Sequence, residues 1–212
     1  PQLQKLIMAP TVMKERVLSL IDREARRSNE GNPGKIIARM NALSDPDVIR
    51  ALYKASNAGV EILLNVRGIC MLVPGVEGMS ENITVISIID RFLEHARVYY
   101  FHNGGMEEIY CASADWMPRN LERRVELMFP IEQNDIKRRL MEYLEIFFRD
   151  NVKSHILQSD GRYVKKQPKS GQEKQRSQEL IFKMHSERSG EIYKQDTKEF
   201  VVRRKSPPAS KR

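Results

Sequence analysis

The sequence predicts an α/β fold, because segments with helical periodicity alternate with segments that are typical of buried strands. The clearest strand is VEILLNVRG at residues 60–68, an apolar run that ends in Arg and Gly. The clearest helix is NDIKRRLMEYLEIFFRD at residues 134–150, whose apolar residues recur on one face. The β-branched run ITVISIID at residues 83–90 predicts a further strand. These segments together indicate a sheet packed against helices.

The first half of the chain contains two predicted helices and a short strand between them. The first helix covers residues 11–28, and the Gly and Pro of the following NEGNPGK sequence end it. Residues 35–42, KIIARMNA, are apolar and are expected to form a strand. The second helix is expected at residues 46–57, because Asp45 can cap its start and Pro46 suits its first turn.

The second half is expected to continue with a hairpin, a short helix, a strand and a long helix. RVYYFHN and IYCASAD predict two strands joined across GGMEE. Residues 118–125 return to a helical pattern, ELMFPI is expected to be a last strand, and the 134–150 helix follows. The loop of residues 69–82 is broken by glycine and proline.

A change in composition predicts a boundary near residue 158. Periodicity fades beyond it, and residues 160–212 hold 15 Lys and Arg against 7 Asp and Glu, which accounts for the whole net charge of +8. We therefore expect a neutral domain at residues 1–158 and a basic, partly disordered tail at residues 159–212, with SQELIFKMH as a short ordered piece. Such a tail can attract a polyanion or a membrane surface.

Several classes of protein are disfavoured by what the sequence lacks. The sequence has no run of eighteen apolar residues, so no membrane span is predicted. The start PQLQKLIMAP has neither an initiator Met nor a signal peptide, which suggests a fragment of a longer chain. Two cysteines without a CxxC motif favour neither a disulfide framework nor a zinc site, and they fit a reducing cytoplasm. PGVEGMSEN lacks the GK[ST] of a P-loop, and no residues have metal-ligand or Ser-His-Asp spacing.

The stretch LEHARVYYFHNGG at residues 93–105 places Glu94 and His95 directly before an apolar strand. With Asn103 opposite Ile109 in the hairpin, Arg97 falls opposite Asp115. The end of the hairpin would then gather four polar side chains, those of His95, Arg97, Ser113 and Asp115. This cluster suits phosphate binding, and the alternative from spacing alone is a cross-strand ion pair at a sheet edge.

Arg67 is the second candidate, because it ends the apolar strand EILLNV and precedes Gly68. A guanidinium group presents a planar fork of donors that fits phosphate oxygens, and α/β sheets bind ligands at the carboxyl ends of their strands. A surface arginine that simply caps a strand is the alternative. Arg119 and Asn120 begin the expected short helix, where either an anion site or a solvated charged face is consistent with the sequence.

The run NVRGICMLVPGVEGMSENITVISIIDRFLEHARVYYFHNGG, followed by SADWMPRNLERRVELMFPI, resembles the C-terminal part of bacterial polyphosphate kinase. VRG, PG, SEN, RFLEH and SADWM.RN occur in that family's order and spacing, and the resemblance covers roughly residues 1–165. It implies a phospholipase-D-like domain at residues 1–158, in which a mixed β-sheet is flanked by helices on both faces. The basic tail after it is not diagnostic.

The resemblance implies a reversible transfer of the terminal phosphate of ATP to inorganic polyphosphate, through a phosphohistidine in the preceding domain and with Mg2+ bound to the ATP. RFLEH places the family's second, catalytic histidine at His95, and VRG places its ATP-contacting arginine at Arg67. Arg97 replaces the lysine of the phospholipase-D pattern HxK...GSxxN and is expected to bind phosphate. The residues expected to support the site are Glu94, Asn103, Ser113, Asp115, Arg119 and Asn120, with Glu94 or Asp115 orienting His95.

The expected partners are ATP or ADP, inorganic polyphosphate and the preceding domains of the same enzyme, with a homo-oligomer for the full-length protein and no specific nucleic acid. The metal ligands are expected mainly outside this chain. The location is expected to be cytoplasmic, including the periphery of the inner membrane. Two other functions are left open: a phospholipase-D-type phosphodiesterase, which Arg97 disfavours, and a non-catalytic polyanion-binding module. The isolated piece is expected to be inactive or weakly active.

Overall fold

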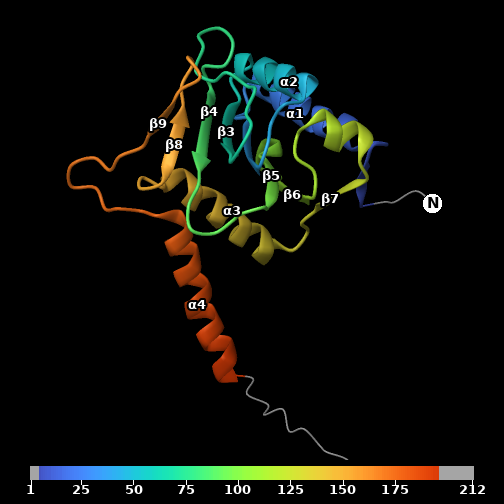
Figure 1. Cartoon of the computed structure of the whole chain (residues 1–212). Coiled ribbons are helices and arrows are strands. Elements are labelled where there is room, and N and C mark those ends of the chain that lie inside the picture. Colours follow the sequence, from blue (N-terminus) through green and yellow to red (C-terminus); the bar gives the residue numbers. More distant parts are fainter. Residues whose placement is uncertain (1–4, 196–212) are drawn as a thin grey trace, which may run out of the picture.

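The computed structural model of the chain describes residues 5–195, and in this part a single sheet is surrounded by helices (Figure 1). Its strands are β1 (Ile7–Ala9), β2 (Lys35–Met40), β3 (Glu61–Val66), β4 (Ile83–Ile88), β5 (Arg97–Phe101), β6 (Glu108–Ala112), β7 (Glu126–Pro130), β8 (Ser154–Leu157) and β9 (Tyr163–Lys165). Its α-helices are α1 (Met13–Asn29), α2 (Pro46–Asn57), α3 (Asn134–Arg149) and α4 (Ser177–Gln195). Two short turns, η1 (Asn103–Gly105) and η2 (Arg119–Arg123), complete the elements.

The strands lie in the order β1-β7-β6-β5-β2-β3-β4-β8-β9. The three adjacent strands β2, β3 and β4 run parallel to one another, and every other pairing is antiparallel. The sheet is therefore mixed. A parallel centre arises because α2 connects β2 to β3 as a crossover helix, which returns the chain to the starting edge.

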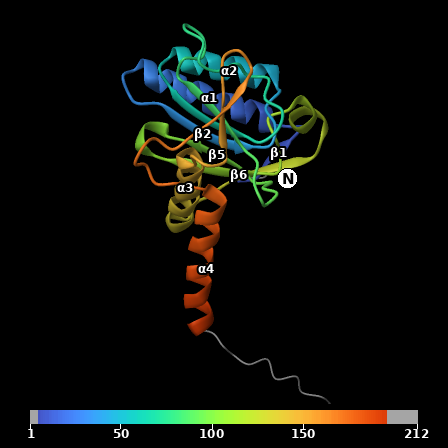
Figure 2. The same cartoon turned by 60° about the vertical axis from the view of Figure 1, so that its left-hand side comes forward.

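Helices cover both faces of the sheet, which confirms the predicted fold class (Figure 2). On one face α1 and α2 bury Val17, Leu20 and Leu52 in the main core with the parallel strands. On the opposite face, the apolar stripe of α3 brings Leu144 against Val98 of β5. The apolar periodicity of 134–150 thus predicted both the helix and its buried face.

The start of α2 follows from its sequence. The Oδ1 atom of Asp45 accepts hydrogen bonds from the backbone N–H groups of Asp47 at 3.0 Å and Val48 at 3.1 Å, and Pro46 occupies the first helical turn. These bonds satisfy donors that a helix leaves free at its N-terminus. The predicted cap at Asp45 is confirmed.

The chain beyond residue 158 continues to contact the body of the fold. β9 pairs with β8, which itself pairs with β4, so the sheet extends past the boundary that composition suggested. The N-terminus of α4 is bound by Asp150, and the helix then projects away from the sheet (Figure 1). The expected ordered piece SQELIFKMH lies within α4, and residues 196–212 of the expected tail lie outside the described residues.

Three short strands, β1, β8 and β9, have no counterpart in the sequence-based expectations, because each is only three or four residues long. The helix expected at residues 118–125 is the single turn η2, since β7 begins at Glu126. Within residues 5–195, no helix combines the length and the apolar character that crossing a membrane requires.

Candidate functional site

The topology brings the ends of four strands to one edge of the sheet. β2 and β3 end at this edge, β5 runs antiparallel to β2 and so begins there, and β6 runs antiparallel to β5 and so ends there. Asn41 follows β2, Arg67 follows β3, Arg97 begins β5 and Asp115 follows β6. Polar groups from distant parts of the sequence therefore meet at the carboxyl ends of the parallel strands, where α/β sheets bind ligands.

Arg97 and Asp115 form a bidentate ion pair at this edge. The Nη2 atom of Arg97 lies 2.9 Å from Oδ2 of Asp115, and Nε lies 3.1 Å from Oδ1. The side chains are only 11% and 9% exposed. Oδ1 of Asp115 also accepts a hydrogen bond from the backbone N–H of Asn41 at 2.7 Å. The ion pair is thus fixed to the end of the neighbouring strand β2.

The electrostatics keep both groups of this pair charged. Burial by itself would raise the pKa of the Asp115 carboxyl, but hydrogen bonds from Arg97 and from the backbone N–H groups of Asn41 and Ala42 lower that pKa below its ordinary value. Burial likewise opposes the charge of Arg97, yet the hydrogen bonds and charge of Asp115 raise its pKa.

Arg97 also fixes His95. Its Nη1 atom donates to the backbone oxygen of His95 at 2.9 Å and contacts Nδ1 of the imidazole at 2.9 Å, while Nη2 lies 3.3 Å from Nε2. A guanidinium group can only donate, so the shorter ring contact favours an unprotonated Nδ1 and a proton on Nε2. The imidazole itself is exposed. Arg97 therefore holds His95 through Nη1 and Asp115 through Nε and Nη2, and the imidazole stays accessible from solvent.

Arg67 joins the same network through Asn41. Its Nε atom donates to Oδ1 of Asn41 at 2.9 Å, while the backbone N–H of Asn41 donates to Asp115. The side-chain amide of Asn41 thus accepts from Arg67, and its backbone N–H donates to Asp115, the partner of Arg97. Within residues 5–195 the two Nη atoms of Arg67 have no hydrogen-bond partner, so they remain available to an anion.

Glu94 does not orient His95, contrary to one of the two options expected from the sequence. It forms an ion pair with Arg39, a residue of β2 whose guanidinium lies 4.7 Å from the centre of the Phe147 ring and donates from Nη1 to the oxygen of Ala96 at 2.9 Å. The reason is that Arg39 is almost completely buried and requires a counter-charge. Asp115 is linked to His95 through Arg97, which binds both side chains.

The three arginines of this edge lie close enough for their charges to interact. Burial is the main cause of the lowered pKa of Arg39, which the charge of Glu94 opposes, and the charges of Arg67 and Arg97 lower it further. Arg39 and Arg97 are each paired with a carboxylate, whereas Arg67 has no carboxylate partner among the described residues, which leaves the edge receptive to an anion. Phosphate groups are well matched to it, because they can accept several guanidinium donors at once.

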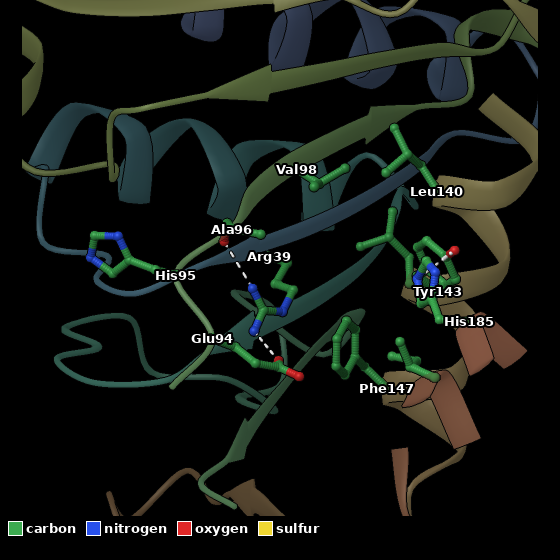
Figure 3. Close-up of a pocket in the computed structure, with 11 residues that line it drawn as sticks. Arg39, Glu94, His95, Ala96, Val98, Leu140, Tyr143, Phe147 and His185 are labelled. Carbon is green, nitrogen blue, oxygen red and sulfur yellow. Dashed lines mark hydrogen bonds and ion pairs between the residues drawn. The ribbon is translucent and has the colours of Figure 1, made fainter. Parts of the chain in front are cut away.

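A pocket of about 270 Å³ opens beside His95, between the start of β5, α3 and α4 (Figure 3). Its walls are mostly apolar. The residues that line it are Arg39, Glu94, His95, Ala96, Val98, Leu140, Tyr143, Leu144, Phe147, Ile181 and His185. The Tyr143 hydroxyl and Nε2 of His185 lie 2.9 Å apart at its far side.

A second pocket, of about 320 Å³, lies on the other side of Arg67. Arg67, Gly68, Ser87, Ile89, His155 and Tyr163 line it. The expected position of Arg67 at the end of a strand is confirmed, because β3 ends at Val66. Arg67 therefore belongs both to the network that holds His95 and to the wall of a second open space.

The register of the hairpin differs from the expected one by three residues. Ile109 pairs with Tyr100 rather than with Asn103, and Arg97 pairs with Ala112 rather than with Asp115. Asp115 lies beyond the end of β6, where the long side chain of Arg97 reaches it. The expected ion pair is therefore present, but the strand pairing that suggested it is wrong.

Asn103 does not lie with the other candidates. It follows the opposite end of β5, roughly 20 Å along the strand from Arg97 at the usual rise per residue. Its backbone N–H donates to Glu24 at 2.8 Å, and its side-chain amide donates to Glu108 at 3.0 Å. Its backbone has a φ of 50° in the turn η1, so its contacts are those of a structural turn residue.

Ser113 and Asn120 lie beside the Arg97 network and are organised by Glu126. The Ser113 hydroxyl donates to Oε2 of Glu126, and the Asn120 amide donates to Oε1 at 2.7 Å. Ser113 therefore does not contact His95 as the expected register implied. The charge of Glu126 nevertheless contributes to raising the pKa of Arg97, after burial and Asp115. Arg119 is exposed on η2.

Two residues of this site were missed by the sequence-based reading, Asn41 and Arg39. Arg39 did leave a signal, since a charged residue in the otherwise apolar strand KIIARM must find a buried partner. The only sequence signal of Asn41 is its position after a predicted strand, and this position does not indicate that Asn41 links Arg67 to Asp115. Among residues 5–195, no group of three or more His, Cys, Asp and Glu side chains is arranged to hold a metal ion.

Residues 6–178 match the family model described as polyphosphate kinase C-terminal domain 2. A polyphosphate kinase from Synechocystis sp. is 55% identical over 178 residues, which are 84% of this chain and 24% of the relative. One from Rhodopirellula baltica is 52% identical over 180 residues, 85% of this chain and 21% of the relative. The crystal structure of the polyphosphate kinase from Porphyromonas gingivalis aligns with a TM-score of 0.86 and 39% identity over 90% of this chain and 29% of that one. The chain thus spans about a quarter of the length of these curated relatives.

Proposed function

Because the chain belongs to the polyphosphate kinase C-terminal domain 2 family, we propose that it supplies one half of an active site that reversibly transfers the terminal phosphate of ATP to inorganic polyphosphate. The other half belongs to a preceding domain of a longer protein, in keeping with the quarter of its relatives that the chain spans. That domain would carry the histidine that becomes phosphorylated.

One observation carries this proposal: a continuous hydrogen-bonded network links His95, Arg97, Asp115, Asn41 and Arg67 along one edge of the sheet. It fixes one imidazole and one guanidinium that both keep free polar atoms. Phosphoryl transfer needs positioned positive charge and in-line geometry more than covalent help from this scaffold. The network provides positive charge in fixed positions. It contains no nucleophile that a neighbouring base activates.

In the proposed reaction Arg67 binds phosphate oxygens of ATP through its two free Nη atoms. The bond between the γ-phosphorus and the bridging oxygen to ADP breaks as a bond forms to a nitrogen of the histidine outside this chain. His95 donates a hydrogen bond from Nε2 to an oxygen of the phosphate near the point of transfer, and Arg97 maintains the ring in that orientation. In the second half, a terminal oxygen of polyphosphate attacks the phosphohistidine, and the phosphorus–nitrogen bond breaks.

ATP is used with Mg2+ in this proposal, and the metal would neutralise charge on its phosphates. The described residues of this chain do not fit a dedicated magnesium site, because no suitable cluster of carboxylates is present among them. The metal ligands are accordingly assigned to the preceding domain and to the nucleotide. What this chain contributes is binding and orientation by Arg67, His95 and Arg97.

The remaining assignments follow from the same proposal. The partners are ATP or ADP, polyphosphate, the preceding domains and a second copy of the full-length enzyme, which would work in the cytoplasm or at the periphery of the inner membrane. We assign the catalytic domain to residues 1–158 and the basic tail to residues 159–212, although side-chain contacts with the body continue to His185. The relatives are kinases, so the comparisons favour this role over a phospholipase-D-type phosphodiesterase.

Calorimetric titration of the 212-residue chain with polyphosphate and with Mg-ATP, beside a radiolabel transfer assay, tests the proposal. We expect binding without transfer, because the phosphorylated histidine lies elsewhere. Transfer by the chain alone would place the phosphohistidine within it, with His95 the first candidate. Binding of neither ligand by the chain, combined with normal turnover of a full-length His95→Ala variant, would contradict the proposed site.

A further inference from the structure

His95 lies in an irregular segment, residues 89–96, which we call the histidine loop. The loop has no regular backbone hydrogen bonding, and Ile89 and Leu93 expose 73% and 77% of their surface. Its conformation therefore has little support from apolar packing of its own. The position of the catalytic imidazole depends on side chains that fasten the loop from outside.

Arg97 and Arg39 fasten the end of the loop, and the start of α4 fastens its beginning. Nη2 of Arg176 lies 2.7 Å from Oδ1 of Asp90, and Nε lies 2.8 Å from Oδ2, which is a bidentate pair. The Asp90 side chain is only 1% exposed. Hydrogen bonds from Arg176 are the main cause of the lowered pKa of Asp90.

Gln178 holds the middle of the loop through both ends of its amide. Its Oε1 atom accepts from the backbone N–H of Phe92 at 2.8 Å, and its Nε2 atom donates to the backbone oxygen of Phe92 at 2.9 Å. Gln178 is 5% exposed, although it lies in a segment that composition assigns to the tail. The rings of Phe92 and Phe182 stack with their centres 6.3 Å apart, which adds a contact one turn further along α4.

The start of α4 is itself rigidly attached to the body. Oδ2 of Asp150 accepts from both the backbone N–H and the hydroxyl of Ser177, each at 2.7 Å, and Ser177 is fully buried. Asn151 and Gln175 exchange two more bonds, from the N–H of Asn151 to the oxygen of Gln175 and from the N–H of Gln175 to Oδ1 of Asn151. The helix start thus acts as an anchor with a fixed place relative to the sheet, rather than as a segment that follows the loop.

We propose that Arg176 and Gln178 are positioning residues of the phosphoryl transfer, which hold the histidine loop so that His95 meets the transferred phosphate. The inference rests on the proposed function, since it concerns the loop that carries His95. Neither side chain lines the pocket beside His95 or contacts the Arg97 network. Arg176 binds the loop at Asp90, four residues before Glu94, and Gln178 binds it at Phe92, two residues before Glu94.

The test uses the full-length enzyme with Gln178→Ala and, because Asp90 is buried, Arg176→Lys in place of an alanine variant. Lysine keeps the charge but cannot form the bidentate pair. Phe182→Ala removes only the exposed ring contact and carries little risk of unfolding. The matched controls are Gln172→Ala and Arg162→Lys, exposed residues of the same region whose side chains bind only Lys169 and Asp160.

We expect kcat to fall by about 10-fold for Gln178→Ala and Arg176→Lys, as for a displaced catalytic group, with KM for ATP within about twofold. Phe182→Ala should give a smaller decrease in the same direction, and both controls should keep full activity. Amide hydrogen exchange should accelerate at residues 91–96 and stay unchanged in β3 and β4. In a His95→Ala background, Gln178→Ala should lower kcat by less than twofold, because the group that it positions is gone.

Unchanged kcat in both Gln178→Ala and Arg176→Lys would overturn the inference. An equal decrease with and without His95 would also overturn it, since it would indicate a general effect on the fold. Full activity of the His95→Ala enzyme itself would instead contradict the proposed function, and the inference with it. The three results are distinguished within one set of kinetic measurements.

Discussion

Arg97 and Asp115 are joined by two hydrogen bonds, Nη2 to Oδ2 at 2.9 Å and Nε to Oδ1 at 3.1 Å, although the hairpin places Arg97 opposite Ala112. The pair connects the turn after β6 to the residue that holds His95. Because Asp115 also accepts from the backbone of Asn41, one carboxylate organises three strand ends.

Asp115→Ala should lower the free energy of unfolding of this chain by about 3 kcal/mol, because it leaves the guanidinium of Arg97 largely buried without its partner. Urea unfolding monitored by circular dichroism measures the change. Asp160→Ala is the control, since that carboxylate pairs with Arg162 on the surface and should cost no more than about 1 kcal/mol. Equal losses of unfolding free energy in the two variants would show that the Arg97–Asp115 pair stabilises the fold no more than a surface ion pair does.

Acid should destabilise the chain through Asp115, Asp90 and Asp150. Burial opposes the ionised forms of Asp115 and Asp150, but hydrogen bonds outweigh it, and the pKa of each of the three carboxyls is lowered in the fold. A lowered folded-state pKa adds stability that is present above the unfolded value of about 3.9 and is lost as the pH falls through the folded value. The unfolding free energy should therefore fall below about pH 4.

The Asp150→Asn variant provides the control for this acid effect. Asp150 accepts from the backbone N–H groups of Val152, Lys153, Ser154 and Ser177. An uncharged amide removes one titrating group, so the curve of unfolding free energy against pH should be lower at neutral pH and flatter in acid. A variant with the same acid slope as the original chain would exclude Asp150 as a contributor.

His95→Ala in the full-length enzyme should lower kcat by about 100-fold or more, the usual contribution of a positioned acid or base. The imidazole is exposed, so the melting temperature should change little. His102→Ala is the matched control, because His102 lies at the other end of β5. Unchanged turnover of His95→Ala would remove this histidine from the mechanism.

Arg67→Ala should raise KM for ATP more than it affects folding, since one half-exposed charge at a strand end contributes little to stability. Asn41→Ala should raise the same KM to a smaller extent, because it leaves Arg67 in place but removes the acceptor for Nε. Steady-state kinetics and melting curves separate the two effects. Loss of the cooperative unfolding transition in Arg67→Ala would indicate that Arg67 has a purely structural role.

The basic C-terminal residues should affect polyphosphate binding only at low salt. Residues 196–212 contain six Lys and Arg, and their replacement by Gln should weaken binding at about 0.05 M salt but not at about 0.5 M, where screening is strong. Replacing the exposed Arg138 and Arg139 of α3 is the control. Binding with the same salt dependence before and after the tail replacement would assign the tail no electrostatic role.

Local sequence determined those elements whose pattern is strong over many residues. The apolar stripe of 134–150 predicted α3 and its buried face, Asp45 and Pro46 predicted the start of α2, and EILLNV predicted β3 with Arg67 at its end. In each case the deciding interactions join neighbours in the sequence or follow from burial of one face. The order of the motifs also sufficed for the family, which the match over residues 6–178 shows.

Only the tertiary structure decided which side chains of the site contact one another. A register error of three residues changed every cross-strand pair of the hairpin, since pairing depends on the turn and on neighbouring strands. Glu94 faces Arg39 rather than His95, because a buried arginine needs a counter-charge that the sequence does not locate. Asn41 reaches the Arg97 network, and Arg176 and Gln178 reach the histidine loop, from distant segments of the chain. Periodicity reports which face of an element is buried, but the partners across a site depend on how elements far apart in the chain are brought together.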